Sequence, residues 1–189
     1  MNKLELIGAL FGIAGVWLTV KEKIGCFPVG IINVLITAYL VFSQKLYADT
    51  LQQVVYFILL IVGWVNWYKA GRTNTTAVTM LSTSQRFGFL IVFISATASM
   101  YLLLKFYTDA ALPFWDSTGT VICFIAQYLV AKKKIENWLL WMIANTMYVG
   151  IFYVKGMEYY SILSIVYFIQ AVFGWHDWKK NLNPQNISK

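Results

Sequence analysis

Charged residues are scarce in this chain of 189 residues: they make up 12% of the sequence, whereas hydrophobic residues make up 59%. Ordinary soluble domains carry about 25% charged residues. A soluble fold of this length could not bury so much apolar surface, so we expect lipid to cover it. The scarcity of charge therefore excludes an ordinary soluble domain and predicts a membrane protein.

Residues that build enzyme and metal sites are also scarce. The two cysteines, Cys26 and Cys123, are too few and too far apart for a disulfide framework or a metal site, and we expect both to pack as small apolar residues. The single histidine, His176, stands beside Asp177 near the end of the chain, where a solvated side chain is expected. The sequence contains no catalytic Ser–His–Asp or Cys–His arrangement and no phosphate-binding glycine-rich loop. It thus predicts a protein that is not an enzyme and that holds no metal and no cofactor.

Long apolar runs without charge dominate the chain instead. Seven of them come near the roughly 20 residues that a helix needs to cross a bilayer, once their interfacial ends are included. The runs are too long and too uniformly apolar for barrel strands, so the predicted fold class is all-α: a polytopic membrane protein with seven transmembrane helices. The predicted spans cover residues 6–20, 24–42, 51–68, 87–104, 117–131, 138–154 and 159–175.

Basic residues gather in the loops on one side of these spans. The positive-inside rule then places the N-terminus outside and the C-terminus in the cytoplasm. Because the net charge of +7 is spread over short loops between apolar runs, it does not indicate nucleic acid binding. The richer side holds Lys21, Lys23, Lys69, Arg72, Arg86, Lys132, Lys133, Lys134, Lys179, Lys180 and Lys189, and the other side holds Lys3, Lys45, Lys105 and Lys155.

The chain also repeats itself at an offset of 111 positions. Residues 55–58 (VYFI) recur as residues 166–169, and the motif Gly-Trp-x-x-Trp stands at both 63–67 and 174–178. Spans one to three match spans five to seven, and span four is left as a linker, which gives both halves the same orientation. The predicted organisation is a first three-helix repeat (1–70), a cytoplasmic loop with a linker helix (71–112) and a second three-helix repeat (113–189).

A thin polar and aromatic stripe follows one face of several spans at steps of three and four residues. Amides can bond hydroxyls or a carboxamide, and aromatic rings can stack on a flat ring, so the stripe suits a small ring compound that is uncharged or cationic. The alternative is that these side chains only tie helices together, at about 1 kcal/mol per bond. The stripe includes Gln53, Tyr56, Asp116, Thr120, Cys123, Gln127, Trp141, Asn145, Tyr148, Tyr167 and Gln170.

The tryptophan pairs end the third and seventh spans on the basic side of the membrane. Either they form an aromatic belt at the lipid headgroups, or they pack or gate near the inner mouth, which the recurrence of the preceding glycine favours. The four residues concerned are Trp64, Trp67, Trp175 and Trp178. No Asp, Glu, Lys or Arg lies inside the core of any span, so we expect passive transport without a coupling ion. A scaffold that transports nothing remains the other interpretation.

Several strings of the sequence resemble the nicotinamide riboside transporter family (PnuC). They are residues 44–49 (QKLYAD), 51–54 (LQQV), 113–117 (PFWDS) and 134–141 (KIENWLLW), together with both Gly-Trp-x-x-Trp motifs and Asn145. The resemblance implies facilitated uptake of a vitamin precursor across the bacterial inner membrane, with a cytosolic kinase that traps the product by phosphorylation. It also implies a homotrimer and a three-plus-one-plus-three architecture like that of the SWEET sugar carriers.

The resemblance further implies which residues contact the cargo. Those residues are Gln53, Tyr56, Trp141, Asn145 and Tyr148, with Asp116 and Gln127 in addition. Asp49 and Asp116 are expected near the outer mouth, where each either draws in a cation or caps its helix. Thiamine, or another vitamin or nucleoside, is the alternative cargo, and Asn145 favours the riboside.

Overall fold

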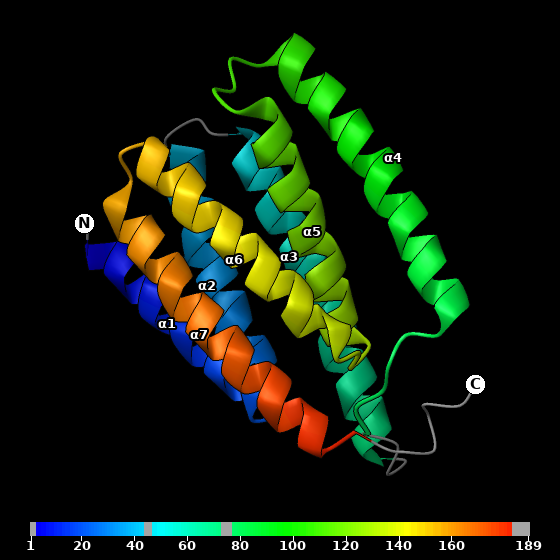
Figure 1. Ribbon diagram of the computed structural model, residues 1–189. Helices are drawn as coiled ribbons and strands as arrows, with labels where there is room; N and C mark the ends of the chain where they lie inside the picture. The colour runs from blue at the N-terminus through cyan, green and yellow to red at the C-terminus, as the bar shows by residue number, and fades with distance from the viewer. Residues whose placement is uncertain (1–2, 44–46, 73–76, 183–189) are drawn as a thin grey trace.

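The chain folds into helices throughout the part that the computed structural model describes, residues 3–43, 47–72 and 77–182. The seven helices predicted from the sequence are confirmed there, and most extend beyond the predicted spans (Figure 1). Four of them, α1, α2, α3 over Asp49–Gly71, and α4, are long and apolar enough to cross a membrane. The helices are α1 (Lys3–Val20), α2 (Cys26–Ser43), α3 (Tyr47–Arg72), α4 (Thr83–Tyr107), α5 (Pro113–Ala131), α6 (Glu136–Val154) and α7 (Glu158–Lys180).

Six of the seven helices close a ring. Each of the neighbouring pairs α1–α2, α2–α3, α3–α5, α5–α6 and α6–α7 is in contact, and α7 returns to pack against α1. Among the described helices α4 packs along α5 and reaches α6 through the Arg86–Glu136 ion pair at 3.3 Å, and Figure 1 shows it leaning away from the rest of the bundle. The helix predicted to be a linker therefore lies outside the ring.

The turn between α1 and α2 has the same backbone geometry as the turn between α5 and α6. Glu22 and Lys133, which the offset of 111 equates, are the two non-glycine residues with positive φ among those described, at 52° and 51°. In both turns an amide N–H closes the loop at 2.9 Å, from Lys23 to the Leu18 carbonyl and from Lys134 to the Leu129 carbonyl. The residues between Glu22 and Cys26 belong to this turn, so α2 starts at Cys26, two residues later than the predicted span.

Four aromatic rings fill the space between the two halves beside these turns. The Trp67 and Trp178 rings lie 6.0 Å apart between centroids. Phe27 meets Trp67 edge-on at 5.1 Å, and Trp138 meets Trp178 edge-on at 5.3 Å. The offset of 111 equates these two edge-on pairs, so both halves contribute the same contact to one core.

The indole N–H groups of this core bond across the two halves. Trp67 on α3 donates to the Val130 carbonyl of α5 at 3.1 Å, and Trp178 on α7 donates to the Thr19 carbonyl of α1 at 3.1 Å. These bonds also correspond under the offset of 111. Each half therefore donates one indole hydrogen bond to a backbone carbonyl of the other half.

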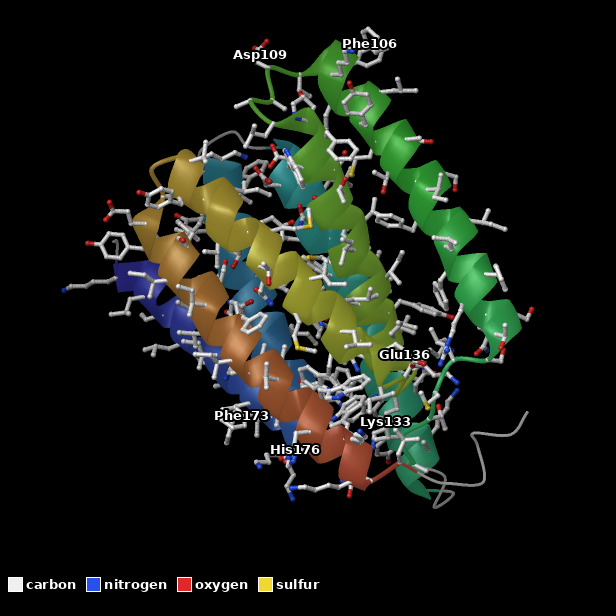
Figure 2. All side chains as sticks on the ribbon, in the orientation of Figure 1. Phe106, Asp109, Lys133, Glu136, Phe173 and His176 are labelled. Carbon is white, nitrogen blue, oxygen red and sulfur yellow. The ribbon has the colours of Figure 1, made fainter. Side chains whose placement is uncertain are left out.

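Basic side chains meet at this end of the bundle, which we call the lysine-rich end. Figure 2 shows Lys133 and His176 there, and Asp109 and Phe106 at the opposite end. The loop before α4 also packs there, since the Thr79 N–H donates to the Lys133 carbonyl at 3.1 Å. Of the predicted loop cations, Lys45 and Lys189 lie outside the described residues. The lysine-rich end is defined by Lys21, Lys23, Lys132, Lys133, Lys134, Lys179 and Lys180.

Candidate functional site

Side chains from three helices meet in the middle of the bundle, between the lysine-rich end and the opposite end. Cys123 on α5 belongs to a buried group against which the rings of Tyr56 on α3 and Tyr148 on α6 pack. Trp141 of α6 packs against the same group of buried residues. We call Tyr56, Cys123, Trp141 and Tyr148, with the adjacent Asn145, the central cluster. Aromatic faces and small polar groups adjoin one another there.

Both tyrosine rings of the central cluster are held in place by their neighbours. The Gln52 side-chain amide donates to the Tyr56 hydroxyl at 3.4 Å, and Phe124 meets the Tyr56 ring edge-on at 5.5 Å. The Tyr148 ring stacks on Phe152, with centroids 5.4 Å apart and an interplanar angle of 17°. The two hydroxyls are thus presented on fixed rings, as a binding site requires.

Asn145 lies one helical turn from Trp141 and is 7% exposed. Its amide nitrogen donates to the Trp141 carbonyl at 2.8 Å, which fixes the orientation of the amide plane. That bond leaves the carbonyl oxygen and a second N–H of the same amide for other partners. An oriented amide of this kind can bond a carboxamide or a hydroxyl of a small molecule.

The other residues predicted to contact cargo lie apart from the central cluster. Gln53 and Gln127 are half-buried, and within the described residues no hydrogen bond joins either to the cluster. Asp116 accepts from Lys155 at 2.9 and 3.0 Å near the opposite end. Asp116 does not cap α5, since Leu112 is the N-cap residue and makes no side-chain bond. The ion pair leaves Asp116 less available to a cation than the sequence suggested.

The four predicted gating or packing tryptophans divide into two kinds. Trp67 and Trp178 are buried between the halves, at 5% and 0% exposure. Trp64 is 38% exposed on the outside of α3, and Trp175 is half-buried. The position of the first two fits a barrier at the lysine-rich end, whereas Trp64 has the position of a side chain facing lipid.

Gln170 on α7 was not among the predicted ligand contacts, although the helical spacing places it in the polar stripe. Its amide nitrogen donates to the Ile13 carbonyl of α1 at 3.0 Å. Its carbonyl oxygen is buried and has no hydrogen-bond partner among the described residues. Leaving a buried acceptor without a donor costs about 1–3 kcal/mol, so a bound molecule that donates there would recover free energy.

A second polar group lies near Gln170 on the side of the bundle formed by α1, α2 and α7. A Cβ atom at Gly12 would touch the Tyr167 hydroxyl, and it would lie 3.2 Å from the Asn33 amide nitrogen. The offset of 111 equates Tyr167 with Tyr56 and Gly12 with Cys123. The sequence repeat was therefore the signal that could have identified this counterpart of the central cluster.

No group of three His, Cys, Asp or Glu residues within the described chain could hold a metal ion. The two cysteines, Cys26 and Cys123, are both free and buried, as predicted from their number and spacing.

Comparison with known proteins adds sequence and fold relatives to this geometry. A family model described as nicotinamide mononucleotide transporter matches residues 2–180. The chain is 29% identical over 204 residues to the nicotinamide riboside transporter PnuC of Escherichia coli (strain K12), covering 94% of this chain and 85% of that protein. It is 28% identical over 189 residues to the PnuC protein of Neisseria mucosa, covering 94% and 72% of the two chains.

Two further relatives extend the comparison. The riboflavin/roseoflavin transporter RibM of Streptomyces davaonensis is 20% identical over 178 residues, covering 92% of this chain and 83% of that protein. The crystal structure of the vitamin B3 transporter PnuC has a TM-score of 0.78 to this fold at 26% identity, covering 95% of this chain and 81% of the other.

Proposed function

Since this chain belongs to the nicotinamide mononucleotide transporter family, we propose that it carries nicotinamide riboside across a bacterial inner membrane by facilitated diffusion. The observation that carries the choice of cargo is the lack of charge in the central cluster, which contains tyrosine, tryptophan, cysteine and asparagine side chains. The relatives named as nicotinamide riboside transporters support the same choice.

The uncharged cluster favours the riboside over its phosphorylated form. A mononucleotide would bring a phosphate group into a buried site, where an uncompensated anion is costly unless a cation pairs with it. No lysine or arginine belongs to the central cluster. The positively charged pyridinium ring of the riboside instead gains about 0.5–2 kcal/mol over an aromatic face such as that of Trp141.

Specific roles follow for the polar side chains. We assign the pyridinium ring to the aromatic faces of Tyr56, Trp141 and Tyr148, and the carboxamide to Asn145. The unpartnered Gln170 carbonyl is a further acceptor for a ribose hydroxyl. Gln53, Gln127 and Asp116 remain in the proposed pathway as polar lining toward the opposite end, without an assigned contact.

The proposed architecture is a duplicated unit in which all seven helices cross the membrane. Equal φ values at Glu22 and Lys133, and equal indole bonds from Trp67 and Trp178, support a parallel three-plus-one-plus-three repeat like that of the SWEET carriers. By the positive-inside rule the lysine-rich end faces the cytoplasm, the N-terminus lies outside and the C-terminus lies inside.

Passive transport is supported by the placement of charge along the helices. Every Asp, Glu, Lys and Arg of the seven described helices lies at or beside a first or last turn, which leaves none of these side chains in the middle of a helix for a coupling ion. Accumulation in the cell would then come from a cytosolic kinase that phosphorylates the riboside.

A homotrimer is also proposed, on the resemblance to PnuC. The helix α4 exposes large apolar residues along most of its length, including Phe87, Ile91, Ile94 and Phe106. Such a surface must be covered by lipid or by a sister protomer.

Calorimetric titration of the purified protein tests the choice of cargo. We expect nicotinamide riboside to bind and its mononucleotide, thiamine and riboflavin to bind at least about tenfold more weakly, because the central cluster offers one amide and no cation. Tighter binding of thiamine or riboflavin would keep the fold and replace the cargo. Binding of the mononucleotide as tight as that of the riboside would contradict the argument from charge, and binding of none of the four would favour a scaffold.

A further inference from the structure

A largely buried ion pair joins the two halves at the lysine-rich end. The Lys133 ammonium on the α5–α6 turn lies 2.7 Å from a Glu22 carboxylate oxygen on the α1–α2 turn. The two side chains are 10% and 18% exposed, which makes this the most deeply placed ion pair among the described residues. The pair therefore differs from surface pairs, which water screens and which contribute little.

The two residues of this pair occupy equivalent positions in the two repeats but carry opposite charges. Glu22 and Lys133 occupy equivalent positions of the two turns, and both have a left-handed backbone. In an exact duplicate the same residue would stand at both places, and two like charges would face each other. The flanking residues are lysine in both turns, at 21 and 23 and at 132 and 134. A single difference in charge between the repeats thus converts repulsion into attraction between the halves.

The surroundings of the ion pair fix it further. The Asn181 amide after α7 donates to the other Glu22 oxygen at 2.7 Å. The Lys133 ammonium also lies 4.5 Å from the centre of the Trp67 ring, which adds a cation–π contact. Lys21 and Asp177 form a second, more exposed pair between the halves at 2.8 Å. The hydrogen bond from Lys21 lowers the pKa of the Asp177 carboxyl below its ordinary value, so it stabilises the charged carboxylate.

The ion pair lies beside the buried tryptophans that close this end. Trp67 and Trp178 are in contact with each other, and each bonds a carbonyl of the opposite half. A molecule that passed from the central cluster between the two halves at this end would meet these two rings. Separating them requires the two halves to move apart at the same place.

We propose that Glu22 and Lys133 form the latch of a gate at the lysine-rich end, and that this structure has the gate closed. The inference rests on the proposed transport function, because it assigns the latch to the exit of the cargo. A latch of this chemistry can open thermally, since water replaces part of the attraction when the two charges separate. Loss of one partner leaves a half-buried charge that only the open form can hydrate, so single substitutions should favour the open gate.

Thiol labelling of Cys26 reports the state of the gate. Cys26 is free, 4% exposed and packed in the same core as Trp67, Val130 and Trp178. Purified protein is treated with N-ethylmaleimide, and modification of the Cys26 peptide is followed by mass spectrometry. We expect Glu22→Lys to raise the labelling rate at Cys26 by about tenfold or more, and the double swap Glu22→Lys with Lys133→Glu to return it to near the original rate.

The double swap and a matched control separate the latch from general damage. Glu158→Lys makes the same change of charge at an exposed residue at the opposite end, and we expect it to leave Cys26 labelling unchanged. If Cys26 in the Glu22→Lys variant were labelled at the same rate as in the unsubstituted protein, the proposal would be overturned. A double swap as reactive as the single variant would also overturn it, because a merely destabilised fold would not be rescued by exchanging the charges.

Binding of nicotinamide riboside is measured on the same preparations. If the unsubstituted protein did not bind nicotinamide riboside, the proposed cargo would be refuted. The labelling experiment would then still test the latch independently. Normal binding together with unchanged Cys26 labelling in Glu22→Lys would refute the latch and leave the cargo intact.

Discussion

Replacing Asn145 with leucine should abolish detectable binding of nicotinamide riboside while the protein stays folded. Leucine is similar in size but cannot bond the carboxamide, and Asn145 is 7% exposed, so water cannot replace the lost partner. Two lost hydrogen bonds at about 1–1.5 kcal/mol each predict a fall in affinity of about two orders of magnitude. Calorimetry measures the affinity, and the melting temperature and the elution volume report whether the fold and oligomer persist.

A neighbouring residue offers a matched control for this variant. The Thr146 hydroxyl donates to the Met142 carbonyl at 2.9 Å, just as the Asn145 amide donates to a carbonyl four residues earlier, but Thr146 is exposed. Thr146→Val therefore removes a comparable local bond away from the central cluster, and we expect it to leave the affinity unchanged. An unchanged affinity in Asn145→Leu would remove Asn145 from the site.

Replacing Gly174 with valine should destabilise the whole bundle. A Cβ atom at this position would overlap the Trp138 ring, and the three nearest atoms all belong to that ring. Trp138 is 1% exposed and rests edge-on against Trp178, so the ring has no space into which it can move. Forcing extra atoms into such a core costs about 1–3 kcal/mol or more, which predicts a fall in melting temperature of about 5 °C or more.

The same substitution at a glycine in open space is the control. A Cβ atom at Gly150 on α6 would meet nothing within 4 Å, so Gly150→Val should leave the melting temperature nearly unchanged. The glycine equivalent to Gly174 is Gly63, which faces Phe27 in the same way, and Gly63→Val should behave like Gly174→Val. If the Gly174→Val and Gly150→Val variants had the same melting temperature, close packing of α6 on α7 would not be what limits stability.

The helices could be predicted from the sequence because each is a long apolar run bounded by charge. The start of α2 could not, since the apolar run includes residues 24 and 25, which belong to the turn before the helix. The seven predicted spans are also less uniform than expected: α1 to α4 are apolar enough to span by composition, whereas α5 is the most buried helix and carries polar residues toward the centre.

The central cluster was partly predictable for a similar reason. Helical spacing places Tyr56, Trp141 and Tyr148 on polar faces, but it does not say which faces meet. Trp64 and Trp67 belong to one motif, yet the first is 38% exposed and the second 5%, so the motif does not say which of the two rings faces the other half. The Glu22–Lys133 ion pair joins positions 111 residues apart and depends on how the two halves meet.

Uptake of radiolabelled nicotinamide riboside into liposomes that contain only this protein tests the central claim most directly. With no ion gradient and no kinase, the account predicts that the label enters faster than into protein-free liposomes and stops when the internal concentration equals the external one. Enclosing a riboside kinase and ATP should then drive the total label above that level. Entry no faster than in protein-free liposomes, or accumulation above the external concentration without the kinase, would contradict passive transport of nicotinamide riboside.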